Sequence, residues 1–295
     1  MPRVSIIIPV YQAESTLGRC LGSLSSQTFR NFETIVVDSG PGDSCRRIVD
    51  TCLPEAIYLR HSGRLLPHEA SNLAVRTSGG ALLAFLDPDV YPSRDWLARL
   101  LAARQDRGGV LVGGVACYGN RWIDRGAHYC KFDKWLAGGR PRLLTDAASA
   151  NMLIGRDLLE GVGLFRSGSM HADTDISWRL RAAGVTLWLE PAAIVYHHHL
   201  HTWKSLLRER YRRGGGYGAL WITWVRPSRG RLAWTVAASV IPLRLLSQTA
   251  RVYRNAKSAG EARQLLVTLP VVLSALYAWL LGETGHYLKA LSGRG

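Results

Sequence analysis

The chain has 295 residues, 47% of them apolar, so it is long enough for one large domain or for a domain with an appendage. Its net charge of +15 is uneven, because residues 200–295 hold 15 Lys and Arg against 3 Asp and Glu, a net of +12. Five cysteines without a Cys-x-x-Cys spacing argue against a disulfide framework and against a zinc site. The basic residues flank apolar runs, which favours an anionic membrane surface over nucleic acid as their partner.

Apolar strands alternate with amphipathic helices through the first two thirds of the chain. The sequence predicts strands at residues 4–10, 33–38, 56–60, 81–86, 151–154, 185–190 and 193–197. Helices are predicted from Leu17 onward and at residues 69–77, 93–104, 156–160 and 173–183. Residues 118–147 show no clear period. This alternation predicts an α/β fold with a mostly parallel sheet wrapped by helices.

The character of the chain changes at Trp203. A basic helix is expected over residues 204–213, ended by Gly214-Gly215-Gly216, and two apolar segments follow at 232–243 and 264–282. The second segment has 19 residues without a charge, close to the roughly 20 that a membrane span needs, and the first is shorter. Three arrangements of these segments in a membrane are compatible with their lengths: two tight spans, a re-entrant hairpin or interfacial helices. The positive charge of the link between the segments favours the last two.

Two acids follow the strand at residues 81–86, in the sequence Phe85-Leu86-Asp87-Pro88-Asp89. Open α/β sheets bind their ligands at the carboxyl ends of their strands. Side chains two apart in an extended segment point the same way, so Asp87 and Asp89 can face one hard cation that would hold a diphosphate. The alternative is a solvated turn.

Asp38 ends a second strand and precedes a glycine-rich turn. A carboxylate in that place can accept hydrogen bonds from a base or a ribose, and the alternative is that it caps its own turn. Pro9 and Tyr11 lie at the end of the neighbouring predicted strand, so they would line the same pocket.

Residues 4–40 resemble the opening of the family 2 glycosyltransferases, which have the GT-A fold. The Asp87–Asp89 pattern matches that family's D-x-D motif, and further matches follow in the family's order over about two thirds of the chain. They are Ala150–Ile154 (ANMLI), Gly163–Phe165 (GLF), the acid-rich 172–180 (ADTDISWRL), and Pro191 with 195–197 of the late metal-histidine segment. The resemblance implies a Rossmann-like GT-A catalytic domain over 1–202, a basic helix with a Gly-rich linker over 203–230, and a membrane-associated helical tail over 231–295.

The resemblance also implies roles for individual side chains. Asp173 is the implied general base, which takes a proton from the acceptor hydroxyl, and its alternative role is a helix cap. Asp89 and His197 are the implied ligands of Mn²⁺ or Mg²⁺, with His199 as the rival of His197. The implied contacts to the nucleotide-sugar are Pro9, Tyr11, Asp38, Asn72, Asp87 and Asn151. Asp175 and Arg179 are four residues apart and form either part of the site or a helix ion pair.

We therefore expect a metal-dependent, inverting glycosyltransferase of the hexosyl or deoxyhexosyl type. It would move a sugar from a nucleotide-diphospho-sugar to a saccharide or lipid-linked acceptor at the cytoplasmic face of the cell membrane, with membrane lipid as a partner. The alternatives are a polyprenyl-phosphate sugar transferase and a non-catalytic membrane scaffold that kept the fold. No nucleic acid is expected as a partner, because no nucleic-acid-binding motif is present.

Overall fold

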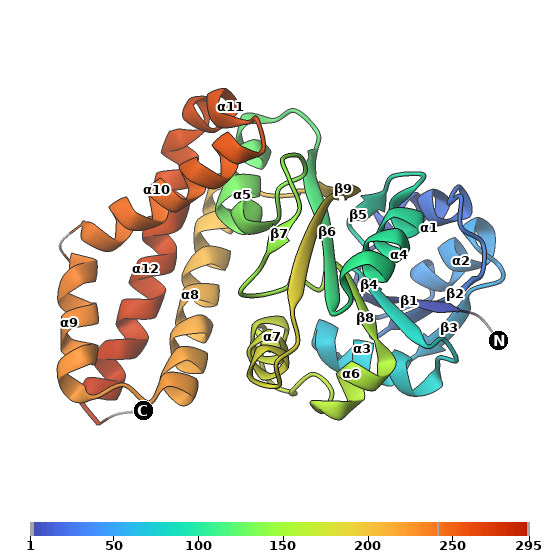
Figure 1. The fold of residues 1–295 in the computed structure, drawn as a ribbon, viewed down its shortest axis with the longest axis horizontal. Coiled ribbons are helices and arrows are strands. Elements are labelled where there is room, and N and C mark those ends of the chain that lie inside the picture. Colours follow the sequence, from blue (N-terminus) through green and yellow to red (C-terminus); the bar gives the residue numbers. More distant parts are fainter. Residues whose placement is uncertain (1–2, 241, 294–295) are drawn as a thin grey trace. The chain divides into compact units, whose positions relative to one another are not determined.

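The computed structural model describes residues 3–240 and 242–293 (Figure 1). The chain forms two compact units. The first comprises Met1–Tyr118 and Trp135–His198, and the second comprises Gly119–Lys134 and His199–Gly295. The predicted region boundaries at residues 202 and 230 stay a prediction.

The first unit is built on a nine-stranded sheet, in the order β3-β2-β1-β4-β8-β6-β9-β5 with β7 beside β9, within the described part of the chain. The strands are β1 (Val4–Val10), β2 (Phe32–Asp38), β3 (Ile57–Arg60), β4 (Leu82–Leu86), β5 (Val90–Pro92), β6 (Val110–Tyr118), β7 (Arg142–Leu143), β8 (Asn151–Gly155) and β9 (Leu187–His198). Strands β1 to β4 pair in parallel, as do β6 and β9. Strand β8 runs antiparallel to both neighbours, and β5 and β7 run antiparallel to β9. The expected mostly parallel sheet is therefore right for β1 to β4 and wrong for the whole sheet, because a strand buried on both faces reads alike in either direction.

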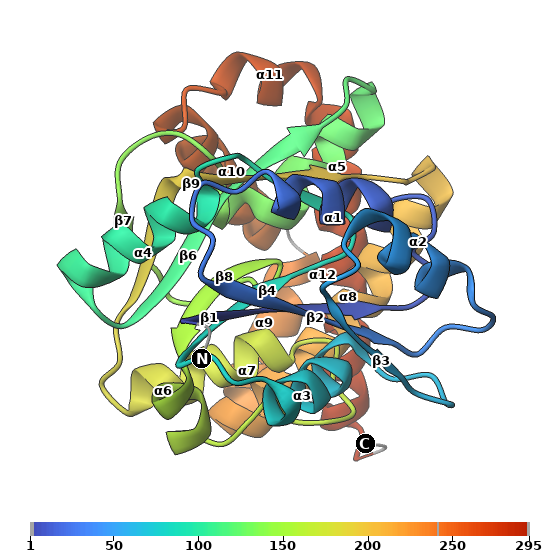
Figure 2. The same cartoon turned by 90° about the vertical axis from the view of Figure 1, so that its right-hand side faces the viewer.

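Helices cover both faces of this sheet. They are α1 (Leu17–Ser25), α2 (Ser44–Cys52), α3 (Pro67–Thr77), α4 (Trp96–Arg107), α6 (Arg156–Gly161) and α7 (Ala172–Ala182). Figure 2 shows α3, α6 and α7 on one face and α1, α2 and α4 on the other. On the α3 side, Ala172 and Ile176 of α7 share a buried apolar cluster with Phe85 of β4 and Met152 of β8. This packing sets α7 on the sheet near the strand that leads into the Asp87–Asp89 pattern.

Strand β9 is one strand of twelve residues, although the sequence predicted two strands separated at Pro191. Buried and more exposed side chains alternate along its whole length. The neighbouring strand β6 makes room for it with two glycines. A Cβ on Gly114 would lie 2.4 Å from the Pro191 carbonyl oxygen, and one on Gly113 would lie 2.3 Å from the Ala193 carbonyl oxygen. The proline is tolerated because the β6–β9 register is irregular at this point.

The second unit is helical. Its helices are α5 (Trp122–Phe132), α8 (Trp203–Val225), α9 (Arg229–Val240), α10 (Leu243–Ser258), α11 (Ala262–Val267) and α12 (Leu269–Leu291), and the short 3-10 helix η1 (Asp133–Trp135) lies where the chain passes between the units. Helix α8 continues through residues 214–216, where the sequence predicted its end. A Cβ on Gly214 would lie 2.1 Å from the Trp279 carbonyl oxygen, and one on Gly282 would lie 2.0 Å from that of Tyr211. The glycines therefore let the α8 and α12 backbones touch, which compensates for their poor helix propensity.

The apolar segment at residues 264–282 forms much of the interior of this unit. Its apolar side chains that are at most 2% exposed include Leu265, Val271, Val272, Ala275, Leu276 and Leu280. Within residues 3–240 and 242–293, no helix is both long enough and apolar enough to cross a membrane.

Candidate functional site

Asp89 and His197 are brought together by the pairing of β5 with β9. The two strands run antiparallel with Val90 opposite His197, and the backbone N–H of His198 donates to the carbonyl of Asp89 at 2.8 Å. As a result, Asp89 Oδ2 lies 3.7 Å from His197 Nε2. The histidine side chain is 5% exposed and the aspartate side chain 35% exposed. The sheet thus holds a buried imidazole beside a carboxylate that solvent can reach.

The residues from Asp87 to Asp89 form a turn, not the extended segment that the prediction assumed. The N–H of Val90 donates to the carbonyl of Asp87 at 3.3 Å, which closes the turn. The two-residue alternation of a strand therefore does not orient these side chains. The turn lies near α1, where the Cys20 thiol is 3.8 Å from the Asp87 carbonyl oxygen. Burial and the charges of Asp89 and Asp87 raise the pKa of this thiol well above its ordinary value.

The Asp89–His197 pair fits a divalent cation. With metal–ligand bonds of about 2.1 Å, two donor atoms on one ion can be at most about 4.2 Å apart. The observed 3.7 Å between Oδ2 and Nε2 is within that limit. A carboxylate with an imidazole is a donor set that suits Mn²⁺ and related ions.

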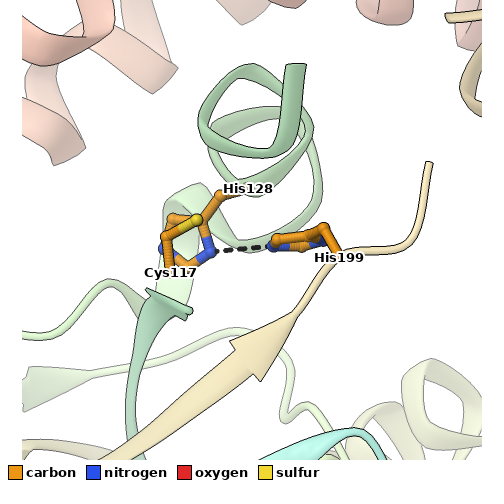
Figure 3. A group of neighbouring side chains, drawn as sticks. All are labelled: Cys117, His128 and His199. Atoms are coloured by element: carbon orange, nitrogen blue, oxygen red, sulfur yellow. Dashed lines mark hydrogen bonds between the residues drawn. The ribbon is translucent and has the colours of Figure 1, made fainter. Parts of the chain in front are cut away.

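His199, the rival of His197, belongs to the second unit and has a different neighbour. Its Nε2 lies 3.3 Å from Nδ1 of His128 on α5, as the dashed line in Figure 3 marks, and both side chains are 1% exposed. Nε2 of His199 is therefore already in contact with a side chain of the helical unit. The geometry therefore favours His197 over His199 as the partner of Asp89.

An aromatic group on three strands stabilises the β5–β9 pairing, and the sequence reasoning missed it. The Tyr91 hydroxyl lies 2.9 Å from Nδ1 of His198, and the Tyr91 ring packs edge-on against Tyr118 with centroids 4.9 Å apart. Arg19 of α1 stacks over the Tyr118 ring at 4.9 Å. Burial raises the pKa of Tyr91 to about 12, so its hydroxyl stays protonated. Strand β5 has only three residues and therefore few backbone hydrogen bonds to β9. These side-chain contacts add to the stability of its pairing.

Asp38 lies at the end of β2 and is 1% exposed. Its Oδ2 accepts hydrogen bonds from the Tyr58 hydroxyl at 2.6 Å and from Arg60 at 3.0 Å, and its Oδ1 accepts from the N–H of Gly40 at 2.7 Å. The last of these is the turn-capping role that was the alternative to nucleotide binding. A carboxylate has about four acceptor positions, so three are in use. Burial and the hydrogen bond to Asp38 raise the pKa of Tyr58 to about 12.

Strand β1 pairs with β2 so that Val10 lies opposite Asp38. Pro9 and Tyr11, on either side of Val10 in the chain, therefore lie beside Asp38. Tyr11 is 37% exposed, and the Arg64 guanidinium stacks 4.5 Å above its ring. The next residue, Gln12, has a φ of 52°, which is uncommon outside glycine and frequent at binding loops. Arg64 is a further candidate contact that the sequence did not indicate, since nothing local marks its partner.

The amides of Asn72 and Asn151 are engaged by the protein itself. Asn72 donates to the carbonyl of Phe165 at 2.7 Å and accepts from its N–H at 3.1 Å. Asn151 is fully buried, donates to two backbone carbonyls on β6 and β9 at 3.0 and 3.1 Å, and accepts from Trp96 Nε1 at 2.7 Å. Both residues therefore have a structural role, and their contact with a nucleotide-sugar stays a prediction.

Asp173 lies in the first turn of α7 and is half-buried. The N-cap position belongs to His171, so Asp173 is not the cap that was its alternative role, although its Oδ1 accepts the N–H of the next residue at 2.8 Å. Asp175 is 2% exposed and pairs with Arg166 at 3.1 Å and Arg179 at 2.9 Å. Of the two acids in this motif, one is thus held in a buried ion pair and the other is accessible.

Comparison with known proteins gives a consistent result. The family model for glycosyl transferase family 2 matches residues 5–163. The glycosyltransferase AglE of Haloferax volcanii is 28% identical over 232 residues, which cover 75% of each chain. The succinoglycan biosynthesis protein ExoM of Rhizobium meliloti is 29% identical over 240 residues, which cover 74% of each chain.

Two solved structures have a similar fold. The mannosyltransferase PcManGT from Pyrobaculum calidifontis, in complex with GDP-Man and Mn²⁺, matches 99% of this chain and 87% of its own at a TM-score of 0.62 and 19% identity. GalNAc-T7, with UDP, GalNAc and Mn²⁺, matches 68% of this chain and 44% of its own at a TM-score of 0.54 and 17% identity. The chain therefore belongs to glycosyltransferase family 2, has the GT-A fold with a mixed sheet, and is a glycosyltransferase.

Proposed function

We propose that the protein transfers a hexosyl or deoxyhexosyl group, with inversion, from a nucleotide-diphospho-sugar to a saccharide or lipid-linked acceptor. The observation that carries this proposal is the 3.7 Å contact between Asp89 and His197 at the ends of β4 and β9. The two similar solved structures support it, because each contains a nucleotide or nucleotide-sugar together with Mn²⁺.

Asp89 and His197 would hold a divalent cation, Mn²⁺ or Mg²⁺, whose charge stabilises the departing diphosphate when it is bound. Asp38, Pro9 and Tyr11 would line the pocket for the nucleoside. Asp173 would take the proton of the acceptor hydroxyl as that oxygen bonds to the anomeric carbon. The bond from this carbon to the diphosphate oxygen breaks on the opposite side, so the configuration of the sugar inverts.

We place the enzyme at the cytoplasmic face of the cell membrane. The support is the net charge of +12 over residues 200–295, since anionic headgroups attract clustered Lys and Arg. The similarity to a protein of succinoglycan biosynthesis supports a saccharide as the acceptor.

The test of the metal assignment is turnover of a panel of nucleotide-sugars, measured as release of nucleotide diphosphate. Chelator should abolish release and Mn²⁺ should restore it. Asp89→Asn and His197→Gln should weaken Mn²⁺ binding, measured directly by titration of the ion. The matched control is Asp95→Asn, which alters an exposed acid paired with Arg99 and should leave Mn²⁺ binding unchanged.

Full activity in chelator would contradict the metal assignment. The stereochemistry is tested separately by NMR of the product, where an α-linked donor should give a β-linkage. A retained α-linkage would contradict inversion and leave the metal assignment standing.

A further inference from the structure

Helix α10 presents several large apolar side chains outward, although Val252 and Ala256 on its inner face are buried. Leu243 is 51% exposed, Leu246 62% and Tyr253 39%, and Ala250 is exposed between them. These spacings of three or four residues place all four on one face of the helix, which we call the outer strip. An ordinary surface helix has its apolar stripe toward the protein interior and polar residues outside, whereas α10 carries this additional apolar strip on its outer side.

The polar side chains on the other face of α10 point into the second unit. Arg244 pairs with Glu283, which is 1% exposed. Arg251 pairs with Asp133 at 3.0 Å, and Asn255 donates to the same carboxylate at 2.8 Å. Rotating the helix to expose these groups would leave two buried carboxylates without their partners, which is strongly destabilising. The interior contacts of α10 thus hold the outer strip on the surface.

The surroundings of the outer strip suit an anionic lipid surface. Arg254 and Lys257 are exposed on the same side of α10, beyond the leucines. An in-plane helix of a membrane interface has this composition, with leucines and an aromatic ring facing the acyl chains and cations near the phosphates. The net charge of +12 over residues 200–295 complements such a surface.

We propose that the outer strip of α10 lies in the boundary between the headgroups and the acyl chains of an anionic membrane, with the helix axis parallel to the membrane plane. Arg254 and Lys257 would contact lipid phosphates. This inference rests on the membrane location within the proposed function and names the surface that makes the contact. In this proposal α10 makes the membrane contact, and not the apolar segment at 264–282, much of which is buried within the unit.

The test is sedimentation of the full chain with phosphatidylcholine vesicles, with and without phosphatidylglycerol. Leu243→Ser with Leu246→Ser should lower the partition coefficient by about tenfold or more, because less apolar surface is buried in lipid. Arg254→Gln with Lys257→Gln should lower it by about fivefold per charge, and only when phosphatidylglycerol is present.

The matched control is Leu266→Ser with Val267→Ser on α11, which alters apolar residues of the same unit that are 55% and 64% exposed. This pair should sediment like the parent. Turnover with a water-soluble acceptor should stay unchanged in every variant, which shows that each has folded.

Each outcome has a distinct meaning. A parent chain that does not sediment contradicts the membrane location and this inference, and leaves the transferase chemistry untouched. A parent that sediments while the Leu243 and Leu246 variant sediments equally well overturns this inference alone, as does loss of binding in the α11 control. A lipid-free dimer that the Leu243 and Leu246 variant breaks would assign the strip to a second copy of the chain and also overturns the inference.

Discussion

Asp173 and Asp175 are two residues apart on α7, and the packing around them gives them different tasks. Asp175 is buried against Arg166 and Arg179, so its carboxylate contributes to the attachment of α7. Asp173 is half-buried in the first turn of α7, where solvent can still reach its carboxylate. This difference in environment is what makes Asp173 the better candidate for proton transfer.

We expect Asp173→Asn to lower kcat by about 10²–10⁴, because the amide keeps the shape of the side chain and cannot take a proton. Donor affinity and the midpoint of thermal unfolding should stay close to those of the parent. Asp175→Asn is the control and should instead lower the unfolding midpoint, since two guanidinium groups lose their partner. If Asp173→Asn turned over within a few-fold of the parent, the base would have to be another residue.

His201 should make the second unit sensitive to acid. Burial and the charge of Lys131 lower its pKa to about 4, and Glu209, Arg210 and Arg213 also face it. Between about pH 6.5 and 4 the unfolded chain binds a proton at His201 that the folded chain does not, so the free energy of unfolding falls as the pH falls. The loss should be about 1–2 kcal/mol, allowing for solvent screening.

Urea unfolding at about pH 7 and about pH 5 measures this loss, and His201→Gln should reduce it. Glu209 acts at lower pH. Burial alone would raise its pKa, but Lys131 and Arg213 lower it to about 2, so its stabilising contribution is lost only as the pH falls from about 4.5 toward 2. A parent chain equally stable at both pH values would show that His201 is not held neutral by the fold.

At the scale of the elements, glycine residues control how α8 and α12 pack. A Cβ on Gly282 would lie 2.0 Å from the Tyr211 carbonyl oxygen and 2.8 Å from the Gly215 nitrogen, and neither backbone atom can move aside alone. We expect Gly282→Ala to lower the free energy of unfolding by about 1–3 kcal/mol, as overpacking does.

Gly285→Ala is the matched control for this prediction, because it lies one turn later on the same helix. Its Cβ would meet only the Tyr211 hydroxyl, at 3.8 Å. Both substitutions gain about 1 kcal/mol of helix propensity, so the difference between them in chemical unfolding reports the close contact. Equal effects would mean that the α8–α12 contact has room to relax.

At the scale of the whole molecule, the second unit is assembled from separate parts of the chain. It takes Gly119–Lys134 from within the sequence of the first unit and joins it to His199–Gly295. Tyr129 of α5 donates to Glu261 at 2.8 Å, and Trp122 donates to the Val267 carbonyl at 2.8 Å. Cutting the chain near the predicted boundary at residue 230 would therefore divide this unit.

We expect a chain that ends after Gly230 to aggregate, because α5 and α8 lose α12, against which they pack. A chain that ends after Ser292 is the control and should stay as soluble as the parent. Size-exclusion chromatography and circular dichroism measure both. A monomeric, donor-binding product from the shorter chain would show instead that the first unit with α5 and α8 is sufficient for folding.

The sequence by itself determined many of the elements and the candidate residues. Strands β1 to β4 and helices α1, α3, α4, α6 and α7 follow from apolar periodicity, which is a property of neighbouring residues. The order of the short motifs identified the family for the same reason. His197 as a candidate came from this order, and Asp89 came both from this order and from its place after a predicted strand. Helices α2 and α5 and strands β5, β6 and β7 were not predicted.

Tertiary structure alone decided which of these residues meet. The Asp89–His197 contact depends on β5 pairing with β9, and the supporting Tyr91–His198 contact joins residues 107 apart in sequence. The outward apolar face of α10 depends on Asp133, which is 118 residues from Arg251. The sequence pattern shows which face of a helix is apolar. In α10, however, the face that packs inward also depends on which distant side chains pair with its charged residues. Those partners are distant in the chain, so local sequence carries no signal for them.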